Sequence, residues 1–167
     1  QAAFDLLDGL LAKHPDQADL LYETALLAER LDKIELMEKR LRRLIELRPD
    51  SAQAYNALGY SLADRKLRLP EAYRLIEKAL SLSPEDHFIL DSMGWVLFRL
   101  GQPDEALHYL ERAFAHHEDP EIAAQSGEVR WAQGRQDDAR QLWLRMLKKH
   151  PSSEALGEVL RRFGVSE

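Results

Sequence analysis

The chain has 167 residues, with 23 lysines and arginines against 29 aspartates and glutamates, so its formal net charge is −6. A composition that is 45% hydrophobic and 31% charged is typical of one globular domain and excludes a disordered chain. The acidic balance disfavours nucleic-acid binding, which requires positive charge to displace phosphate counterions. The lack of cysteine excludes a disulfide framework and a thiolate zinc site. No apolar run reaches the roughly 20 residues of a membrane span.

The composition also predicts the secondary-structure class. The chain contains 30 leucines and 20 alanines, but only 4 valines, 5 isoleucines and 1 threonine. Leucine and alanine lose little conformational freedom in a helix, whereas the β-branched residues that favour strands are nearly absent. We therefore predict an all-α chain. Because it opens at Gln1 inside an apolar helical pattern, we expect it to be a fragment of a longer protein.

Two kinds of residue recur along the chain with a period near 34. The prolines that follow apolar-periodic segments, and so mark helix ends, are Pro15, Pro49, Pro84 and Pro151. Small residues repeat with nearly the same spacing in two columns, which are Gly59, Gly94 and Gly127, and Ala72, Ala106 and Ala139. A shared period of this length indicates a stacked array of helical repeats.

The segment 92–114 shows what one repeat contains. A first helix carries apolar residues at helical spacing and ends at Gly101, and Pro103 then begins a second helix with the same spacing. We interpret Gly94 and Ala106 as small because the two helices cross closely there. Applied along the chain, the pattern predicts helix breaks near residues 15, 33, 50, 67, 85, 101, 119, 134 and 151.

This pattern of a small residue in each helix, a glycine in the turn and a closing proline resembles the tetratricopeptide repeat (TPR). The resemblance implies an all-α, TPR-type right-handed α-solenoid of antiparallel helix pairs, with ten helices in a single array over residues 1–167. Residues 18–51 match weakly, since Ala25 and Met37 stand where smaller residues are usual. The predicted divisions are a half repeat over 2–15, repeats over 18–51, 52–86, 87–119 and 120–153, and a capping helix over 154–163.

No motif in the sequence predicts catalysis. The chain lacks the serine-hydrolase, phosphate-loop and dinucleotide signatures, and it has no strand to present one. The cluster formed by His116, His117, Glu118 and Asp119 contains metal-binding side chains, but adjacent residues at a helix end point apart, so we expect a solvated helix terminus. We therefore predict a protein that is not an enzyme and that holds no cofactor and no metal.

The TPR resemblance implies that a partner binds along the concave groove formed by the first helix of each repeat. The predicted protein-binding or peptide-binding residues lie on these helices, off their packing stripe, and are Tyr22, Leu26, Asn56, Tyr60, Asp91, Trp95, Arg99, Glu128 and Trp131. The same columns contain Asp19, Gln53, Phe88 and Glu121.

Two of the predicted tryptophans have an alternative interpretation. Trp95 is expected to be a groove anchor, paired along the groove with Tyr60, because a large aromatic residue with a polar edge is typical of an interface. The alternative, equally open, is that Trp95 packs against the adjoining repeat as core. For Trp131, partial packing is favoured.

The stretch DSMGWVLFRLGQPDEALHYLERAF, followed by DPEIAAQSGEVRWAQGRQDDARQLW, is similar to the C-terminal repeats of large TPR lipoproteins of Gram-negative bacteria. This resemblance implies a non-catalytic scaffold that acts as a periplasmic adaptor, tethered to the outer membrane by a segment outside this chain. Its partners would be a carboxy-terminal processing protease and the cell-wall hydrolases delivered to it. No nucleic acid and no direct membrane insertion are expected.

Two alternatives from other classes stay open. The apolar helix over 2–15 lacks a partner on one side, so the chain is alternatively a self-assembly module that forms homo-oligomers in a larger envelope complex. A catalytic domain outside these residues is the other alternative.

Overall fold

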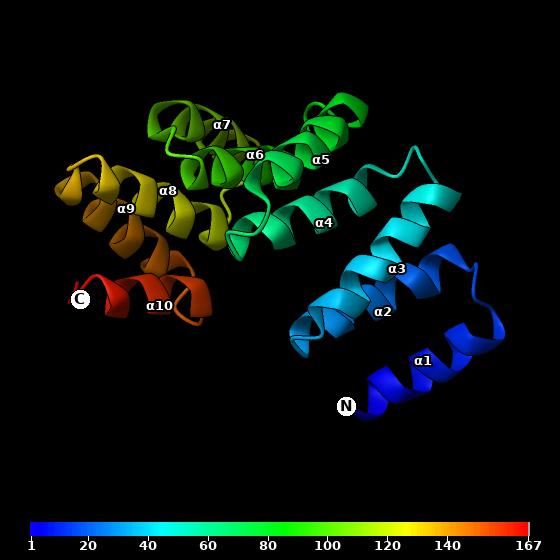
Figure 1. Cartoon of the computed structure of the whole chain (residues 1–167). Helices are drawn as coiled ribbons and strands as arrows, with labels where there is room; N and C mark the ends of the chain where they lie inside the picture. The colour runs from blue at the N-terminus through cyan, green and yellow to red at the C-terminus, as the bar shows by residue number, and fades with distance from the viewer. Residues whose placement is uncertain (167) are drawn as a thin grey trace. The chain divides into compact units, whose positions relative to one another are not determined.

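The computed structural model describes residues 1–166, and within this range it contains ten α-helices and no strand (Figure 1). The helices are α1 (Ala2–Lys13), α2 (Ala18–Arg30), α3 (Ile34–Leu47), α4 (Ala52–Asp64), α5 (Leu69–Leu82), α6 (His87–Arg99), α7 (Pro103–His116), α8 (Pro120–Ala132), α9 (Gln136–Lys149) and α10 (Glu154–Arg162). The all-α prediction is confirmed, and the predicted helix breaks fall at the observed connections. None of the helices in the described range is long and apolar enough to cross a membrane.

The helix ends lie at residues whose side chains or backbone conformations favour the start or the end of a helix. Asp86 caps α6 by accepting hydrogen bonds from the amides of Phe88 (2.9 Å) and Ile89 (3.3 Å). Gly101 ends the first helix of its repeat with φ of +80°, a left-handed conformation that favours glycine. Pro103 then occupies the first turn of α7, where its missing amide proton costs no helical hydrogen bond.

The turn between α4 and α5 differs from the others, because the repeat 52–86 carries one extra residue there. Lys66, with φ of +55°, is left-handed like the second residue after the first helix in the other repeats, which is Asp32, Gly101 or Gly134. The extra residue brings a second left-handed residue, Arg68, with φ of +42°. Leu69 and Pro70 then begin α5 directly. The longer turn therefore changes the local backbone and leaves the helix pair intact, since α4 and α5 pack closely against each other.

The chain forms two compact units, the first over Gln1–Pro84 and the second from Glu85 onward. In the first unit, α2 packs on α3 and α4 packs on α5, with α1 against α2 and α3 against α4. Arg40 of α3 is 6% exposed, and it pairs with Asp8 of α1 and donates a 3.2 Å hydrogen bond to the carbonyl of Thr24 in α2. A buried arginine therefore ties three helices of this unit together.

The second unit contains the close helix crossing that the small-residue columns predict. A Cβ placed on Gly94 would lie 2.6 Å from Cγ of Leu110 and 3.0 Å from the carbonyl oxygen of Ala106. Both distances are shorter than ordinary van der Waals contacts. The α6–α7 pair thus approaches closely because Gly94 has no side chain.

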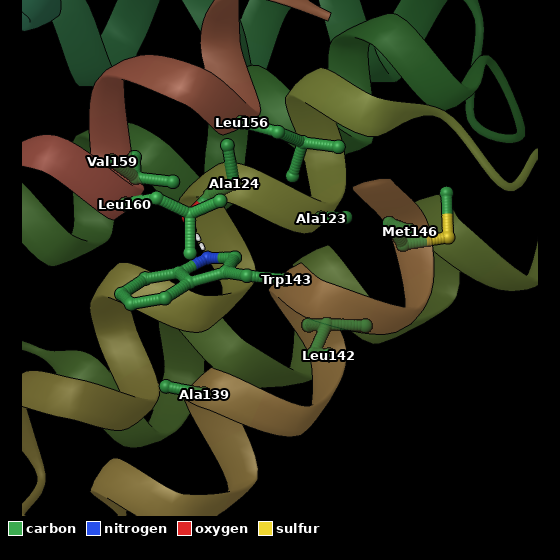
Figure 2. Close-up of a cluster of buried hydrophobic side chains, with 9 residues drawn as sticks. All are labelled: Ala123, Ala124, Ala139, Leu142, Trp143, Met146, Leu156, Val159 and Leu160. Carbon is green, nitrogen blue, oxygen red and sulfur yellow. Dashed lines mark hydrogen bonds between the residues drawn. The ribbon is translucent and has the colours of Figure 1, made fainter. Parts of the chain in front are cut away.

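The last helix, α10, packs on α8 and α9. Trp143 of α9 has no exposed surface, and its Nε1 donates a 3.1 Å hydrogen bond to the carbonyl of Ala124 in α8. Figure 2 shows the buried cluster around this ring, which contains Ala123, Ala124, Ala139, Leu142, Trp143, Met146, Leu156, Val159 and Leu160. Helix α10 therefore covers an apolar surface that α8 and α9 would otherwise expose.

Candidate protein-binding surface

The first unit has a pocket of about 340 Å³ between the first helices of its two repeats. Asp19 and Tyr22 come from α2 and Gln53 comes from α4, so the pocket joins the predicted binding columns of two successive repeats. The remaining lining residues are Ala18, Leu44, Arg48, Asp50, Ser51 and Ala52. Sequence reasoning missed Leu44 and Arg48, because it considered the first helices alone and these residues lie at the end of a second helix.

Tyr22 gives this pocket an aromatic wall with a polar edge. Its side chain is half-buried, and burial raises the pKa of its hydroxyl, with smaller contributions from the negative charges of Glu23 and Glu29. The hydroxyl is therefore protonated at neutral pH and can donate a hydrogen bond. Asp19, Arg48 and Asp50 of the lining are exposed, so the pocket offers an apolar surface flanked by two acidic side chains and one basic side chain.

The other predicted residues of the first unit are Leu26, Asn56 and Tyr60, and each is half-buried. Asn56 lies on α4 one turn after Gln53, and its Oδ1 is buried with no hydrogen-bond donor within the described range. An unsatisfied amide oxygen can accept a hydrogen bond from a partner's backbone. A binding role for these three residues stays a prediction.

In the second unit, the expectation that Trp95 is exposed is wrong. Its side chain is only 4% exposed, it packs against Phe98 with ring centroids 5.5 Å apart, and the guanidinium carbon of Arg99 lies 4.5 Å from its ring centroid. The whole run from Ile89 to Leu97 is buried. The sequence HFILDSMGWVLF is apolar around most of the helix circumference, which is typical of a buried helix rather than of one with an exposed face. Trp95 thus fits the alternative of a core residue.

Glu128 and Trp131 of α8 are both engaged by the capping segment. Glu128 is 13% exposed at its side chain and accepts a hydrogen bond from Arg162 of α10. The ring centroid of Trp131 lies 5.1 Å from that of Phe163 and 5.8 Å from that of Trp143. The partial packing favoured for Trp131 is therefore observed. At the last repeat, α10 and Phe163, which follows it, contact the side chains that the sequence placed in the groove.

The remaining predicted residues, Asp91 and Arg99, lie on α6, and Asp91 has an unusual environment. Asp91 is 9% exposed, and its Oδ1 has no hydrogen-bond donor among the described residues. Burial raises the pKa of its carboxyl well above the usual range, and the charges of Asp119 and Glu121 raise it further. One turn earlier on α6, the ring of Phe88 is 59% exposed. A large exposed aromatic side chain therefore lies one helical turn from a buried carboxyl group.

The raised pKa of Asp91 predicts a pH-dependent stability. The folded chain holds a proton that the unfolded chain releases near the ordinary pKa of 3.8, so the contribution of Asp91 to stability is complete below that pH. It is lost as pH rises through the raised, folded-state pKa. We expect Asp91→Asn to become more stable relative to the parent as pH increases from about 4 to about 8, measured as the difference in melting temperature. Parallel curves for the two proteins would contradict the raised pKa.

The histidine cluster at the end of α7 is paired with other residues. Nε2 of His116 lies 2.8 Å from a carboxylate oxygen of Glu85, and Nζ of Lys149 donates to Glu118 at 2.6 Å. Within residues 1–166, no group of three or more histidine, aspartate and glutamate side chains converges as a metal ion requires. These side chains are exposed at the helix end, where their ion pairs link neighbouring segments of the second unit.

A family model for the tetratricopeptide repeat matches residues 38–87 and 92–163, which is most of the chain. The chain belongs to the tetratricopeptide repeat family. TPR proteins are generally non-catalytic scaffolds that bind other proteins or peptides, and the all-α helix pairs described above agree with that class.

Among curated proteins, the chain is similar to a TPR repeat-containing protein of Pseudomonas aeruginosa, with 45% identity over 128 residues. The match covers 77% of this chain, and the chain spans 22% of the length of that relative. Among solved structures, it is similar to a thermophilic TPR protein of Thermus thermophilus, with a TM-score of 0.84, 24% identity, and coverage of 95% of this chain and 89% of the other. It is also similar to YrrB, a TPR protein, with a TM-score of 0.65, 24% identity, and coverage of 96% and 85%. These structural likenesses show the fold.

Proposed function

We propose that this chain is a non-catalytic scaffold that holds a segment of another protein against the first helices of its repeats. The observation that carries the proposal is the pocket of about 340 Å³, which is lined by Tyr22 and Gln53 from two successive repeats. An aromatic wall beside polar and charged groups suits an extended segment that presents both a side chain and backbone hydrogen bonds. The solved TPR structure of YrrB is described as having an unusual peptide-binding site, so the shared fold supports peptide binding.

We further propose that the partner system is a protease adaptor of the Gram-negative cell envelope. In this proposal the longer protein is tethered to the outer membrane, lies in the periplasm, and presents cell-wall hydrolases to a carboxy-terminal processing protease. The support is the similarity of residues 91–143 to the C-terminal repeats of TPR lipoproteins. The relative from P. aeruginosa, which is itself Gram-negative, adds to that support.

The scaffold proposal predicts that Tyr22→Ala weakens partner binding. Removal of a central interface aromatic residue commonly costs about 2 kcal/mol, which is about thirtyfold in the dissociation constant. The measurement is calorimetric titration with the protein that the parent chain captures from a cell-envelope extract. Since Tyr22 is half-buried beside an open pocket, its removal should lower the melting temperature little.

The matched control is Tyr109→Ala, which removes a half-buried tyrosine from α7, a second helix of its repeat. We expect this variant to bind like the parent. If the parent, Tyr22→Ala and Tyr109→Ala bind the partner equally well, the pocket is not part of the binding site. If both variants lose binding, general destabilisation is the cause. Melting temperatures measured on the same samples separate these results.

Self-assembly is the second candidate function, and one observation favours it. On α1, Leu6 is 68% exposed and Leu10 is 39% exposed. Exposed leucines on one helix are typical of a surface that a partner covers. Light scattering over a hundredfold range of concentration tests the idea, because a mass that stays monomeric throughout would overturn it.

A further inference from the structure

Asp91 combines two properties that a merely structural residue seldom has. It is a carboxylate that is 9% exposed, and its Oδ1 is buried without a hydrogen-bond donor in the described part of the chain. A buried polar atom without a partner costs free energy, and such atoms are uncommon in native proteins. Where one persists, a ligand that supplies the missing partner is a physical explanation.

The surroundings of Asp91 oppose its ionisation, because burial and nearby negative charges both favour the protonated, neutral carboxyl group. Asp119 caps the N-terminus of α8 and Glu121 lies in its first turn, and the charges of both act on Asp91 from across the contact between α6 and α8. Glu121 is exposed, and the side chain of Asp119 is 23% exposed. The site therefore has a carboxyl group at its base and two carboxylates closer to solvent. The imidazole of His117 lies near one of them, with its Nε2 3.9 Å from a carboxylate oxygen of Asp119, and acidic groups predominate in the site.

Phe88 adds an apolar contact to these charges. Its ring is 59% exposed and lies one helical turn before Asp91 on α6. An aromatic ring attracts a cation over its face and also packs against the aliphatic stem of a long basic side chain. A small inorganic cation would use the carboxylates and leave the ring unused, whereas arginine and lysine would use both.

We propose that Phe88, Asp91, Asp119 and Glu121, here called the Asp91 site, bind an arginine or lysine side chain of the protein segment that the scaffold holds. This inference rests on the proposed scaffold function and specifies the chemistry of the partner. The aliphatic stem of the basic side chain packs beside Phe88 and Glu121, which are both exposed. Its charged end then donates a hydrogen bond to Oδ1 of Asp91. The positive charge of the bound side chain favours ionisation of Asp91, so binding supplies the buried carboxyl group with both a donor and a counter-charge.

The test is a titration of the ¹⁵N-labelled chain with blocked pentapeptides that differ only at the central residue. The four peptides contain arginine, lysine, citrulline or glutamate between alanines, and citrulline matches the shape of arginine without its charge. We expect the arginine and lysine peptides to shift the amide signals of α6 and of the first turn of α8 at concentrations up to about 10 mM, the range for a single short contact. The citrulline peptide should bind about tenfold more weakly, since charge-assisted hydrogen bonds are stronger than neutral ones.

The variant Asp91→Asn should weaken binding of the arginine peptide about tenfold, because it keeps the shape of the side chain and removes its charge. Asp137→Asn is the matched control, since Asp137 lies on α9 of the same unit with its side chain 90% exposed. It should bind like the parent. Glu121→Gln, on an exposed first turn, gives a second variant whose folding is not at risk, and it should weaken binding by a smaller factor.

Three results would overturn the inference. These are an affinity unchanged by both Asp91→Asn and Glu121→Gln, a citrulline peptide that binds as well as arginine, and an absence of shifts in α6 and α8. The captured partner separates this failure from failure of the scaffold proposal. If the partner binds the Asp91→Asn variant as tightly as the parent while Tyr22→Ala loses it, the scaffold function stands and the Asp91 site does not.

Discussion

Trp143→Ala should lower the free energy of unfolding by roughly 3–5 kcal/mol, the usual cost of truncating a fully buried aromatic residue. The ring has no exposed surface, and it contacts both Trp131 and Phe163, with centroids 5.8 Å and 5.3 Å away. Its removal leaves a cavity and also leaves the carbonyl of Ala124 without its side-chain donor. Helix α10 depends on this cluster, so we expect its amides to lose hydrogen-exchange protection first.

The control for this prediction is Trp143→Phe, which keeps an aromatic ring and removes the donor together with part of the volume. We expect it to cost clearly less than the alanine variant, because hydrogen bonding contributes about 1 kcal/mol and the residual cavity is smaller. Urea denaturation of both variants, followed by circular dichroism, measures the difference. If Trp143→Ala unfolds at the same urea concentration as the parent, the ring does not hold α10 on α8 and α9.

The local features of the fold could be predicted from the sequence because each depends on nearby residues. The prolines after α1, α3, α5 and α9 fix helix ends through backbone sterics, and Gly101 supplies a positive φ that few other residues adopt. In the weakly matching segment 18–51, the predicted break near residue 33 falls between α2 and α3. Ala25 and Met37 replace smaller residues there, and both are fully buried in the packing of α2 on α3.

The exposure of individual side chains was less predictable, because it depends on which helices pack against a given face. The position of Trp95 directly after Gly94 in the sequence is compatible with a side chain in a groove or in the core. In the structure, the side chain of Trp95 is buried. For Glu128 and Trp131, the deciding contacts come from Arg162 at the end of α10 and from Phe163 just after it. The one sequence signal that indicated burial of Trp95 was the apolar character of α6 on nearly all sides.

The charged neighbours of individual side chains also could not be predicted from the sequence. An arginine on α3 is expected at the surface, yet Arg40 is 6% exposed. It donates hydrogen bonds to Asp8 on α1 and to the carbonyl of Thr24 on α2. Asp91 stood in the predicted binding column simply as one polar residue among several. Its burial and its proximity to Asp119 and Glu121 depend on the α6–α8 contact, and spacing along one helix does not reveal that contact.

Gly94→Leu should destabilise the chain by about 3 kcal/mol, because a side chain at this position must enter the crossing of α6 and α7. A Cβ there already lies 2.6 Å from Leu110 Cγ and 3.0 Å from the Ala106 carbonyl, and the backbone oxygen has little freedom to move. Leucine is the better helix former by about 0.5–1 kcal/mol, so the observed loss is what remains after that gain. For a chain of this size, the melting temperature should fall by roughly 6–12 °C.

Gly157 provides the matched control, because it lies inside α10 and a Cβ placed on it meets no atom within 4 Å. Gly157→Ala should leave the melting temperature unchanged or raise it, since alanine is favoured over glycine inside a helix by about 0.5–1 kcal/mol. Opposite signs at two helical glycines would show that space at the crossing, rather than helix propensity, selects glycine at position 94. If Gly94→Leu is as stable as Gly157→Ala, the two helices separate without cost, and the small-residue columns that revealed the repeat do not report on packing.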